Sequence, residues 1–405
     1  MPHLIQAGIV VVIAAIASLK LSLPEGLLSY DRRGYSGTGR HEYCTALVES
    51  NKFLSYNPAM NHYGLIALVA FIVSLLLVLV GFRFFPKLKL MDRPEKYGFK
   101  RKPIPYYGGI LIFLAFMICV CIFVPFSREL LGLLVAASLI AITGFFDDYF
   151  CLNPIFRLIV QVIAAIILVF FGVGILSISN PLGGIVDLNT IVLYGIPVLG
   201  AIFTVIWIVL VTNTMNFLDG VPGLSSGVTF ISAITIFFLS IRPGIHADIA
   251  SQATLASIAL ILAFVVLAFL IFDFPPARML MGDTGSTFLG FMLAALAIYS
   301  GGKVATAFLV LGVPILDAGW VILRRVFEGK KPWKGDYKHL HHRLLSLGLS
   351  EKWVLFVVYG LSLIFGAVAV LATSTKQKFF IIISLFVLML VLVGGIVIKS
   401  GRNKK

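Results

Sequence analysis

Twelve long apolar runs divide this chain, and they constrain its fold more than any other feature. They cover residues 4–23, 63–85, 107–125, 129–146, 155–178, 191–211, 223–241, 250–272, 285–300, 304–323, 353–372 and 378–398. Most have the length that a helix needs to cross a bilayer, about 17–25 residues. They lack the alternation of apolar and polar residues found in barrel strands, and helices are the other way to satisfy every backbone amide in lipid. We therefore predict an all-α, polytopic membrane protein with about 11–12 transmembrane helices.

Composition agrees with this fold class. Of the 405 residues, 60% are hydrophobic and 12% are charged, whereas a soluble domain carries about 25% charged residues. We expect residues 1–62 to form an extra transmembrane helix with an outer loop, residues 63–372 the main membrane domain, and residues 373–405 a last helix with a basic tail. Because no basic residue precedes the first apolar run, we expect a retained anchor rather than a cleaved signal peptide.

The basic residues predict which ends of the helices face the cytoplasm. Seven lie in 86–106 and seven in 324–351, whereas the 39-residue loop 24–62 holds four. The positive-inside rule therefore places 86–106, 147–154, 212–222, 273–284, 324–351 and the C-terminus inside. The net charge of +14 comes without a nucleic-acid motif, so we expect no nucleic acid as partner. Lipid head groups of the bilayer and phosphorylated substrates fit the charge better.

Two adjacent carboxylates, Asp147 and Asp148, stand in GFFDDY at the end of an apolar run, with Arg157 shortly after them. Carboxylates this close repel each other, so either one is protonated or a cation neutralises both, and Mg²⁺ prefers such hard oxygen ligands. The simpler alternative is a helix end with two solvated aspartates, but negative charge at a helix C-terminus opposes the helix dipole.

Further polar side chains mark the next two inner loops. Asn213, Asn216 and Asp219 are spaced three apart in NTMNFLDG, so one helical turn places them on a common face, where they could hold a metal or a diphosphate. In the next loop, Asp283 lies in a Gly-Asp-Thr-Gly-Ser turn that opens a helix. Free amides at such a helix start attract anions, although Asp283 could simply cap the helix.

The remaining two inner loops are basic. Lys102 belongs to an extended strip, KRKPIP, which could grip phosphates or could serve only as a topology signal. The last loop carries Asp317 and then a cluster made of His339, His341, His342 and Arg343. No cysteine is near and the histidines point in different directions on a helix, so phosphate contact is a better interpretation than zinc. Together, the five loops predict phosphoryl transfer on a lipid-borne substrate.

The DDY pair, NxxNxxDG, GDTGS and HLHH, in this order between about residues 63 and 372, resemble the polyprenyl-phosphate N-acetylhexosamine-1-phosphate transferases, the group that includes phospho-N-acetylmuramoyl-pentapeptide transferase. HLHHRL is similar to the branch that uses UDP-N-acetylglucosamine. The resemblance implies a bacterial cytoplasmic-membrane enzyme whose active site faces the cytoplasm. Such an enzyme transfers a sugar 1-phosphate from a UDP-sugar to a C55-type polyprenyl phosphate and releases UMP. It also implies Mg²⁺ as cofactor, with Mn²⁺ as a substitute, and a homodimer as one expected assembly.

The same resemblance implies residue roles. Asp283 and Asn216 are expected at the metal and the diphosphate, with Asp148 beside the cation. Asp147 is expected at the lipid phosphate as a proton acceptor, and Asp219 is expected to support nucleotide or metal binding. The substrate-binding set is expected to comprise Lys102, Arg157, Asn213, His339, His341, His342 and Arg343. We expect direct attack by the lipid phosphate rather than a covalent aspartyl intermediate, because a phosphate oxygen is already a nucleophile.

The chain departs from the family pattern on the nucleotide side. Pro222 stands where a second aspartate is common, Asp273 where an asparagine is common, and Leu280 where an aromatic residue is frequent. The donor is therefore open between UDP-N-acetylglucosamine, another N-acetylated hexose and the muramoyl-pentapeptide. The alternative from another class is a transporter, which would need polar residues along a path at mid-membrane.

Overall fold

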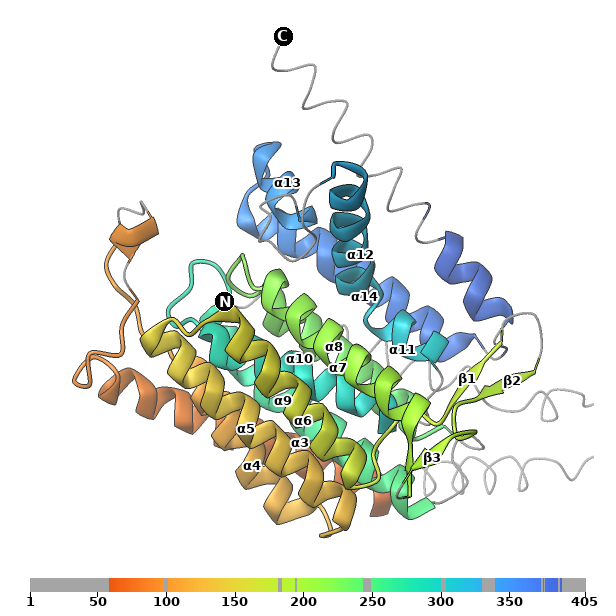
Figure 1. Cartoon of the computed structure of the whole chain (residues 1–405). Helices are drawn as coiled ribbons and strands as arrows, with labels where there is room; N and C mark the ends of the chain where they lie inside the picture. The colour runs from red at the N-terminus through yellow and green to blue at the C-terminus, as the bar shows by residue number, and fades with distance from the viewer. Residues whose placement is uncertain are drawn as a thin grey trace, which may run out of the picture. The chain divides into compact units, whose positions relative to one another are not determined.

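The computed structural model describes residues 58–92, 94–97, 101–180, 184–193, 195–242, 249–299, 304–329, 339–372, 374, 376–384 and 387 (Figure 1). Contacts within the chain separate residues 1–61 from residues 62–405, and apart from the first turn of α3 all the elements below belong to the second unit. The expected first transmembrane helix and outer loop at 1–57 lie outside the described residues, and so does most of the expected helix at 378–398.

Helices make up nearly all of the described chain, which confirms the all-α membrane fold. They are α3 (Pro58–Phe84), the short 3₁₀ helix η2 (Pro94–Tyr97), α4 (Gly108–Phe123), α5 (Arg128–Phe150), α6 (Pro154–Phe170), α7 (Val198–Leu218), α8 (Leu224–Ser240), α9 (Ile249–Asp273), α10 (Gly282–Tyr299), α11 (Val304–Val310), α12 (Gly312–Phe327), α13 (Leu340–Ser346) and α14 (Glu351–Leu371). Within the described residues, five helices are long and apolar enough to cross a membrane: those at Asn61–Phe84, Arg128–Phe150, Val198–Leu218, Ser251–Asp273 and Glu351–Leu371.

Two expected boundaries are wrong. The apolar runs at 155–178 and 191–211 do not continue as helices through their adjoining ends, because α6 stops at Phe170 and α7 starts at Val198. Between them lie two antiparallel hairpins, β1 (Ser177–Ser179) with β2 (Ile185–Asp187) and β3 (Val192–Leu193) with β4 (Ile196–Pro197). Gly172 adopts φ +97°, a left-handed conformation that ends a helix readily, and β-branched residues after it favour strands.

The run at 304–323 also differs from the expectation, because it forms two helices, α11 and α12, instead of one. The break falls at Leu311, the residue before α12. Pro314 lies in the first turn of α12, where its missing N–H removes no hydrogen bond, whereas it would interrupt a continuous helix. Gly312 packs against the ring of Phe365 in α14, and an added Cβ would lie 2.0 Å from that ring. The break therefore turns α12 and its basic end away from the line of α11.

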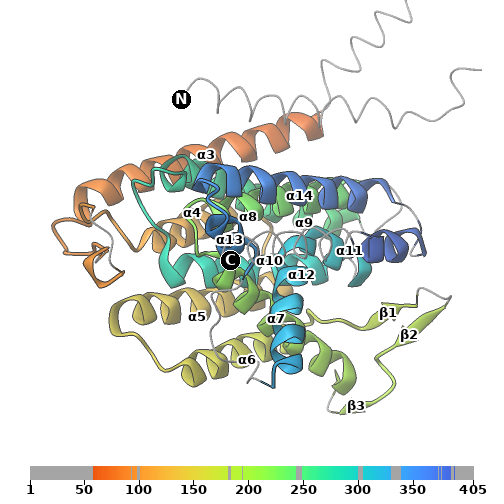
Figure 2. The same cartoon turned by 90° about the horizontal axis from the view of Figure 1, so that it is seen from above.

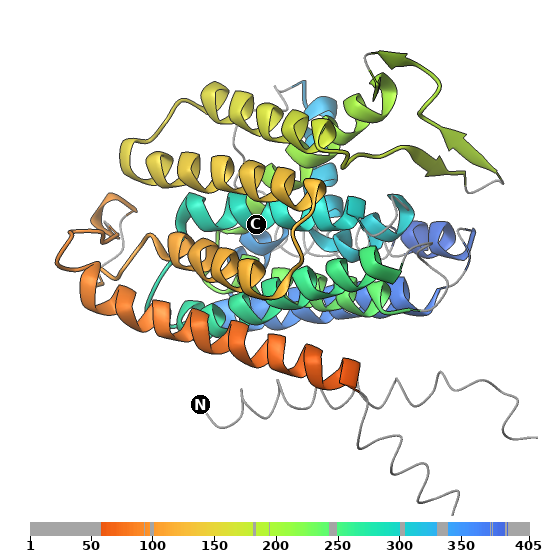
Figure 3. The same ribbon diagram turned by 90° about the horizontal axis from the view of Figure 1, so that it is seen from below.

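The core is built around α10, whose residues from Thr284 to Ile298 are buried. Figures 2 and 3 show α10 between α5 on one side and α8 and α9 on the other. Glycines permit the closest approaches. An added Cβ on Gly109 would lie 2.1 Å from the backbone nitrogen of Gly285, and one on Gly144 would lie 2.6 Å from the Cα of Thr284. Small residues at helix crossings allow such contact within a membrane. They bring the end of α5 against the start of α10, which is where the candidate site lies.

Candidate active site at one end of the helix bundle

The turn between α5 and α6 places Asp147 and Arg157 against each other. Cys151 ends α5 in a left-handed conformation, and the amide of Leu152 donates to Asp147 Oδ1 at 2.8 Å. Asn153 then caps α6 through a 2.9 Å hydrogen bond from the Ile155 amide, with Pro154 in the first turn, which favours a helix start. One turn into α6, Arg157 Nη1 donates to Asp147 Oδ2 at 2.6 Å. The side chain of Asp147 is only 4% exposed and that of Arg157 is 31% exposed, so the carboxylate of this ion pair is buried while the guanidinium is partly accessible.

Asp283 shares the same guanidinium nitrogen. Its Oδ2 lies 3.1 Å from Arg157 Nη1, and its Oδ1 accepts a 2.9 Å hydrogen bond from Asn216 Nδ2. The same Asn216 amide donates to Ser286 Oγ at 2.9 Å, which fixes its orientation. Side chains from α5, α6, α7 and α10 therefore meet at one point. With 37% of its side chain exposed, Asp283 remains accessible to a ligand.

Asp148 has a different environment from its neighbour. Its Oδ1 accepts from the Asp283 amide at 2.7 Å, and its Oδ2 accepts from the Thr284 amide at 2.9 Å and from Thr284 Oγ1. An added Cβ on Gly282 would lie 2.6 Å from Asp148 Oδ2, so glycine is required there. The α10 N-terminus does bind an anion, as its Gly-Asp-Thr-Gly-Ser sequence predicts, and that anion is the carboxylate of Asp148. Asp283 itself is turned toward Arg157 and Asn216 instead of capping its own helix.

Asp219 lies just past the end of α7, partly buried among other acids. Its burial, together with the carboxylates of Asp273, Asp283 and Asp148, raises the pKa of Asp219 well above its ordinary value. Asp273 is 2% exposed and accepts a 2.6 Å hydrogen bond from Ser226 Oγ at the start of α8. An unfavourable concentration of carboxyl groups of this kind is relieved when a cation binds beside it.

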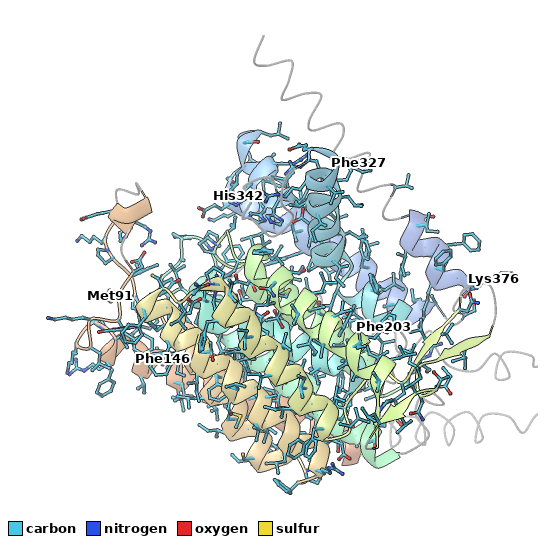
Figure 4. The ribbon with its side chains drawn as sticks, viewed as in Figure 1. Met91, Phe146, Phe203, Phe327, His342 and Lys376 are labelled. Atoms are coloured by element: carbon cyan, nitrogen blue, oxygen red, sulfur yellow. The ribbon has the colours of Figure 1, made fainter. Side chains whose placement is uncertain are left out.

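The histidine cluster packs against the same region. His339 Nδ1 lies 2.9 Å from Asp317 Oδ2 of α12, and the Leu340 amide donates to Asp317 Oδ1 at 2.8 Å. The ring of His341 stacks on that of His339, and an added Cβ on Gly220 would lie 2.5 Å from His341 Nε2. The last inner loop therefore contacts the Asp219-Gly220 turn. Figure 4 shows His342 and Phe327 on this side of the molecule.

His341 is 1% exposed, and neither of its ring nitrogens has a hydrogen-bond partner among the described residues. Burial lowers the pKa of His341 to about 3, so the ring is neutral at ordinary pH. It then presents one donor and one acceptor. His342 and Arg343 follow on α13, and both are partly buried. A buried imidazole without partners is costly unless a ligand completes its hydrogen bonds.

Two of the expected substrate-binding residues, Asn213 and Lys102, do not contact the acidic cluster directly within the described part of the chain. Asn213 Nδ2 donates to Gln161 Oε1 of α6 at 2.6 Å, one turn before Asn216. Lys102 is exposed, and the described residues include no contact from its side chain to the acidic cluster. Its strip nevertheless adjoins the site, because the Leu280 amide donates to the carbonyl of Pro105 at 2.9 Å.

Sequence reasoning missed several residues that hold this site together. Gln161 is 4% exposed and follows Arg157 by one helical turn. A polar residue within an apolar run, on the helix face that carries Arg157, was the sign of it in the sequence. Ser286 and Thr284 belong to the Gly-Asp-Thr-Gly-Ser motif, but their partners come from distant helices. The Tyr107 hydroxyl donates to the backbone carbonyl of Asp148 at 3.2 Å, a contact that no local pattern indicates.

The donors at this site suit magnesium. Asp147 Oδ2 and Asp283 Oδ2 both contact Arg157 Nη1, and the partly exposed side chain of Asp283 is the carboxylate of this pair that a cation could reach. Among the described residues no three His, Cys, Asp or Glu side chains form a ready-made cage. Mg²⁺ is usually held by one or two carboxylates with the rest of its ligands from water and substrate phosphates, so an open carboxylate such as Asp283 fits.

Comparisons of the sequence with known proteins identify its relatives. Residues 130–301 match the family model described as glycosyl transferase family 4. A probable undecaprenyl-phosphate N-acetylglucosaminyl 1-phosphate transferase of Bacillus subtilis is 30% identical over 343 residues, which are 80% of this chain and 89% of the relative. A decaprenyl-phosphate N-acetylglucosaminephosphotransferase of Mycobacterium tuberculosis is 31% identical over 303 residues, 67% of this chain and 73% of the relative.

A third relative, an undecaprenyl-phosphate alpha-N-acetylglucosaminyl 1-phosphate transferase of Thermotoga maritima, is 28% identical over 326 residues, which cover 79% of this chain and 93% of the relative. These matches confirm the resemblance to the family. The chain belongs to the glycosyl transferase 4 family of polyprenyl-phosphate N-acetylhexosamine-1-phosphate transferases.

Proposed function

We propose that this protein transfers N-acetylglucosamine 1-phosphate from UDP-N-acetylglucosamine to a polyprenyl phosphate, releasing UMP and leaving a lipid-linked diphosphate sugar. The observation that carries the proposal is the meeting of Asp147, Arg157, Asp283 and Asn216 from four separate helices at one end of a membrane bundle. Such a cluster can receive two phosphorylated reactants at the membrane edge. The names of the relatives support N-acetylglucosamine over other donors.

In the proposed reaction, an oxygen of the lipid phosphate attacks the phosphorus that carries the sugar. A new P–O bond forms to the lipid phosphate, the P–O bond to UMP breaks, and its electrons leave with the UMP phosphate. Arg157 is positioned to hold the lipid phosphate, and Asp147 orients Arg157 and accepts a proton from the incoming phosphate. Bound Mg²⁺ would neutralise the two approaching anions.

Asp283 is the proposed carboxylate ligand of that Mg²⁺, with Asn216 holding it in place. The contacts of Asp148 support a positioning role instead of a place beside the cation, because both of its oxygens are bonded to the start of α10. Asn213 and Gln161 likewise support Asn216 and Arg157 from the next turn of α7 and α6.

The donor nucleotide is proposed to bind between the Asp219-Gly220 turn and the histidine cluster. His341 contributes unpartnered ring nitrogens there, and the contact of His339 with Asp317 fixes the neighbouring ring. We also propose that the protein lies in a bacterial cytoplasmic membrane with this site toward the cytoplasm, which the distribution of Lys and Arg supports. Homodimer formation stays a prediction.

Purified protein incubated with polyprenyl phosphate, UDP-N-acetylglucosamine and Mg²⁺ should release UMP and form one lipid-linked product per UMP. Chelation with EDTA should stop the release, because the two phosphates then meet without a neutralising cation. Added Mg²⁺ or Mn²⁺ should restore it. UMP release measured by chromatography checks this, with a panel of UDP-sugars as comparison. Release at the full rate in EDTA would contradict the metal role, and product only with another UDP-sugar would contradict the donor.

A further inference from the structure

The connection between α6 and α7 is unusually apolar for a segment outside the helices. Residues 171–197 contain one charged residue, Asp187. Six large apolar side chains in this connection are at least half exposed: Leu176 (50%), Ile185 (72%), Val186 (50%), Ile191 (57%), Val192 (54%) and Leu193 (60%). Monomeric proteins in water rarely expose a continuous apolar patch of this kind. Two-stranded hairpins are also marginally stable in water without a covering surface. This surface therefore requires an apolar neighbour.

The lipid-facing sides of α6 and α7 lead directly into this connection. On α6, Ile163, Ile166 and Phe170 are 44%, 54% and 60% exposed. On α7, which has the length and composition of a membrane span, Ile202 and Ile206 are 50% and 57% exposed. Phe203 lies toward the hairpins in Figure 4. Exposed apolar side chains of the two helices are thus followed along the chain by exposed apolar side chains of the strands.

Helix length gives an independent reason. The 17 residues of α6 rise about 25 Å, which is less than the roughly 30 Å of hydrocarbon in a bilayer. Since Arg157 stands near one end of α6 and the hairpins follow the other end, lipid must extend past Phe170 onto the connection. Pairing of β1 with β2 and of β3 with β4 provides hydrogen-bond partners for part of the hairpin backbone. Backbone groups near lipid need such partners.

We propose that the described parts of this connection, residues 176–180, 184–193 and 195–197, here called the interfacial hairpins, insert their apolar side chains into the lipid leaflet on the side of the membrane opposite the candidate site. Asp187 Oδ1 accepts from the Asn189 amide at 2.8 Å, and this polar turn faces the head groups. The interfacial hairpins fix the depth of α6 and α7 in the bilayer. The same two helices carry Arg157 and Asn216 at their other ends, so the hairpins hold these residues at the height of the lipid phosphates.

Spin-label accessibility in proteoliposomes tests the proposal. Single cysteines at Ile185→Cys and Leu193→Cys are introduced into a variant that lacks Cys44, Cys119, Cys121 and Cys151, after its elution profile and thermal midpoint have been matched to the unmodified protein. Both sites are exposed, so substitution should not disturb folding. Ile206→Cys on the lipid-facing side of α7 and Asn189→Cys in the polar turn are the matched comparisons.

We expect the labels at 185 and 193 to collide with oxygen several-fold more than with a water-soluble nickel complex, as at 206, while the label at 189 shows the opposite preference. A nickel preference at 185 and 193 would place the hairpins in water and overturn the proposal. Low access to both reagents, relieved by dilution with excess lipid, would show that a second copy of the chain covers the surface, which also overturns it. None of these outcomes depends on the reaction proposed above.

Discussion

Replacing Asp283 with asparagine should lower the rate of UMP release about 10³-fold while the protein remains folded. The substitution keeps the size of the side chain and an oxygen that Asn216 can reach, but it removes the negative charge that faces Arg157 and the proposed Mg²⁺. The backbone amide of residue 283 still donates to Asp148, so α10 keeps its start. UMP release at saturating substrates gives the rate, and the thermal midpoint in detergent reports folding.

Asp187→Asn is the matched control for this experiment. It removes one carboxylate from an exposed strand at the other end of α6 and α7, so activity should be unchanged. If Asp283→Asn kept the full rate, Asp283 would have no part in the chemistry. If both variants lost activity equally, the loss would reflect general charge or folding and would not identify a site.

The pair of Asp147 and Arg157 should behave as one unit in a double-mutant cycle. Asp147→Asn and Arg157→Gln should each lower the rate of UMP release by about 10²–10³-fold, because each removes the group that orients or holds the lipid phosphate. The double variant should be no slower than the slower single variant, since residues that act together are not additive. Multiplicative losses would contradict the pairing.

Stability provides a second measurement in the same cycle. Arg157→Gln leaves the buried carboxylate of Asp147 without its cation, whereas Asp147→Asn leaves Arg157 in contact with Asp283, so Arg157→Gln should lower the thermal midpoint more than Asp147→Asn. The pair of Arg101 and Asp92, with side chains 40% and 8% exposed, is the comparison because it lies outside the acidic cluster. Arg101→Gln should cost about 1 kcal/mol or less. Equal losses of the thermal midpoint in Arg157→Gln and Arg101→Gln would contradict a particular stabilising role for the pair of Asp147 and Arg157.

The sequence predicts the parts of this site better than their partners. Carboxylates and amides at the ends of apolar runs identify Asp147, Asn216 and Asp283, since such residues are costly in lipid without a purpose. The carboxylate of Asp148 bonds to an amide 135 residues away, and no local pattern carries that contact. For this reason Asp147 and Asp148 look equivalent in sequence, although one faces Arg157 and the other anchors α10.

The predicted ends of several helices were wrong for a related reason. Ile, Val and Leu have the same hydropathy in a helix as in a lipid-exposed strand. The apolar run at 155–178 therefore does not indicate the hairpins that follow Phe170. The break at Leu311 depends on the packing of Gly312 against Phe365 as well as on Pro314. Tertiary contacts determine where the helices end at both of these places, and such contacts are not visible in a single sequence.

Binding of a divalent ion at Asp283, where side chains from separate helices meet, can be measured directly. Mn²⁺, which has an EPR signal, can be titrated into purified protein with UDP-N-acetylglucosamine, and the free ion counted from its spectrum. We expect one tightly bound Mn²⁺ per chain in the unmodified protein and in Asp187→Asn. In Asp283→Asn the affinity should be at least 10-fold weaker, since loss of even an outer-shell partner of a metal ligand costs about 10–100-fold. Equal Mn²⁺ affinity in all three proteins would contradict a metal site at Asp283.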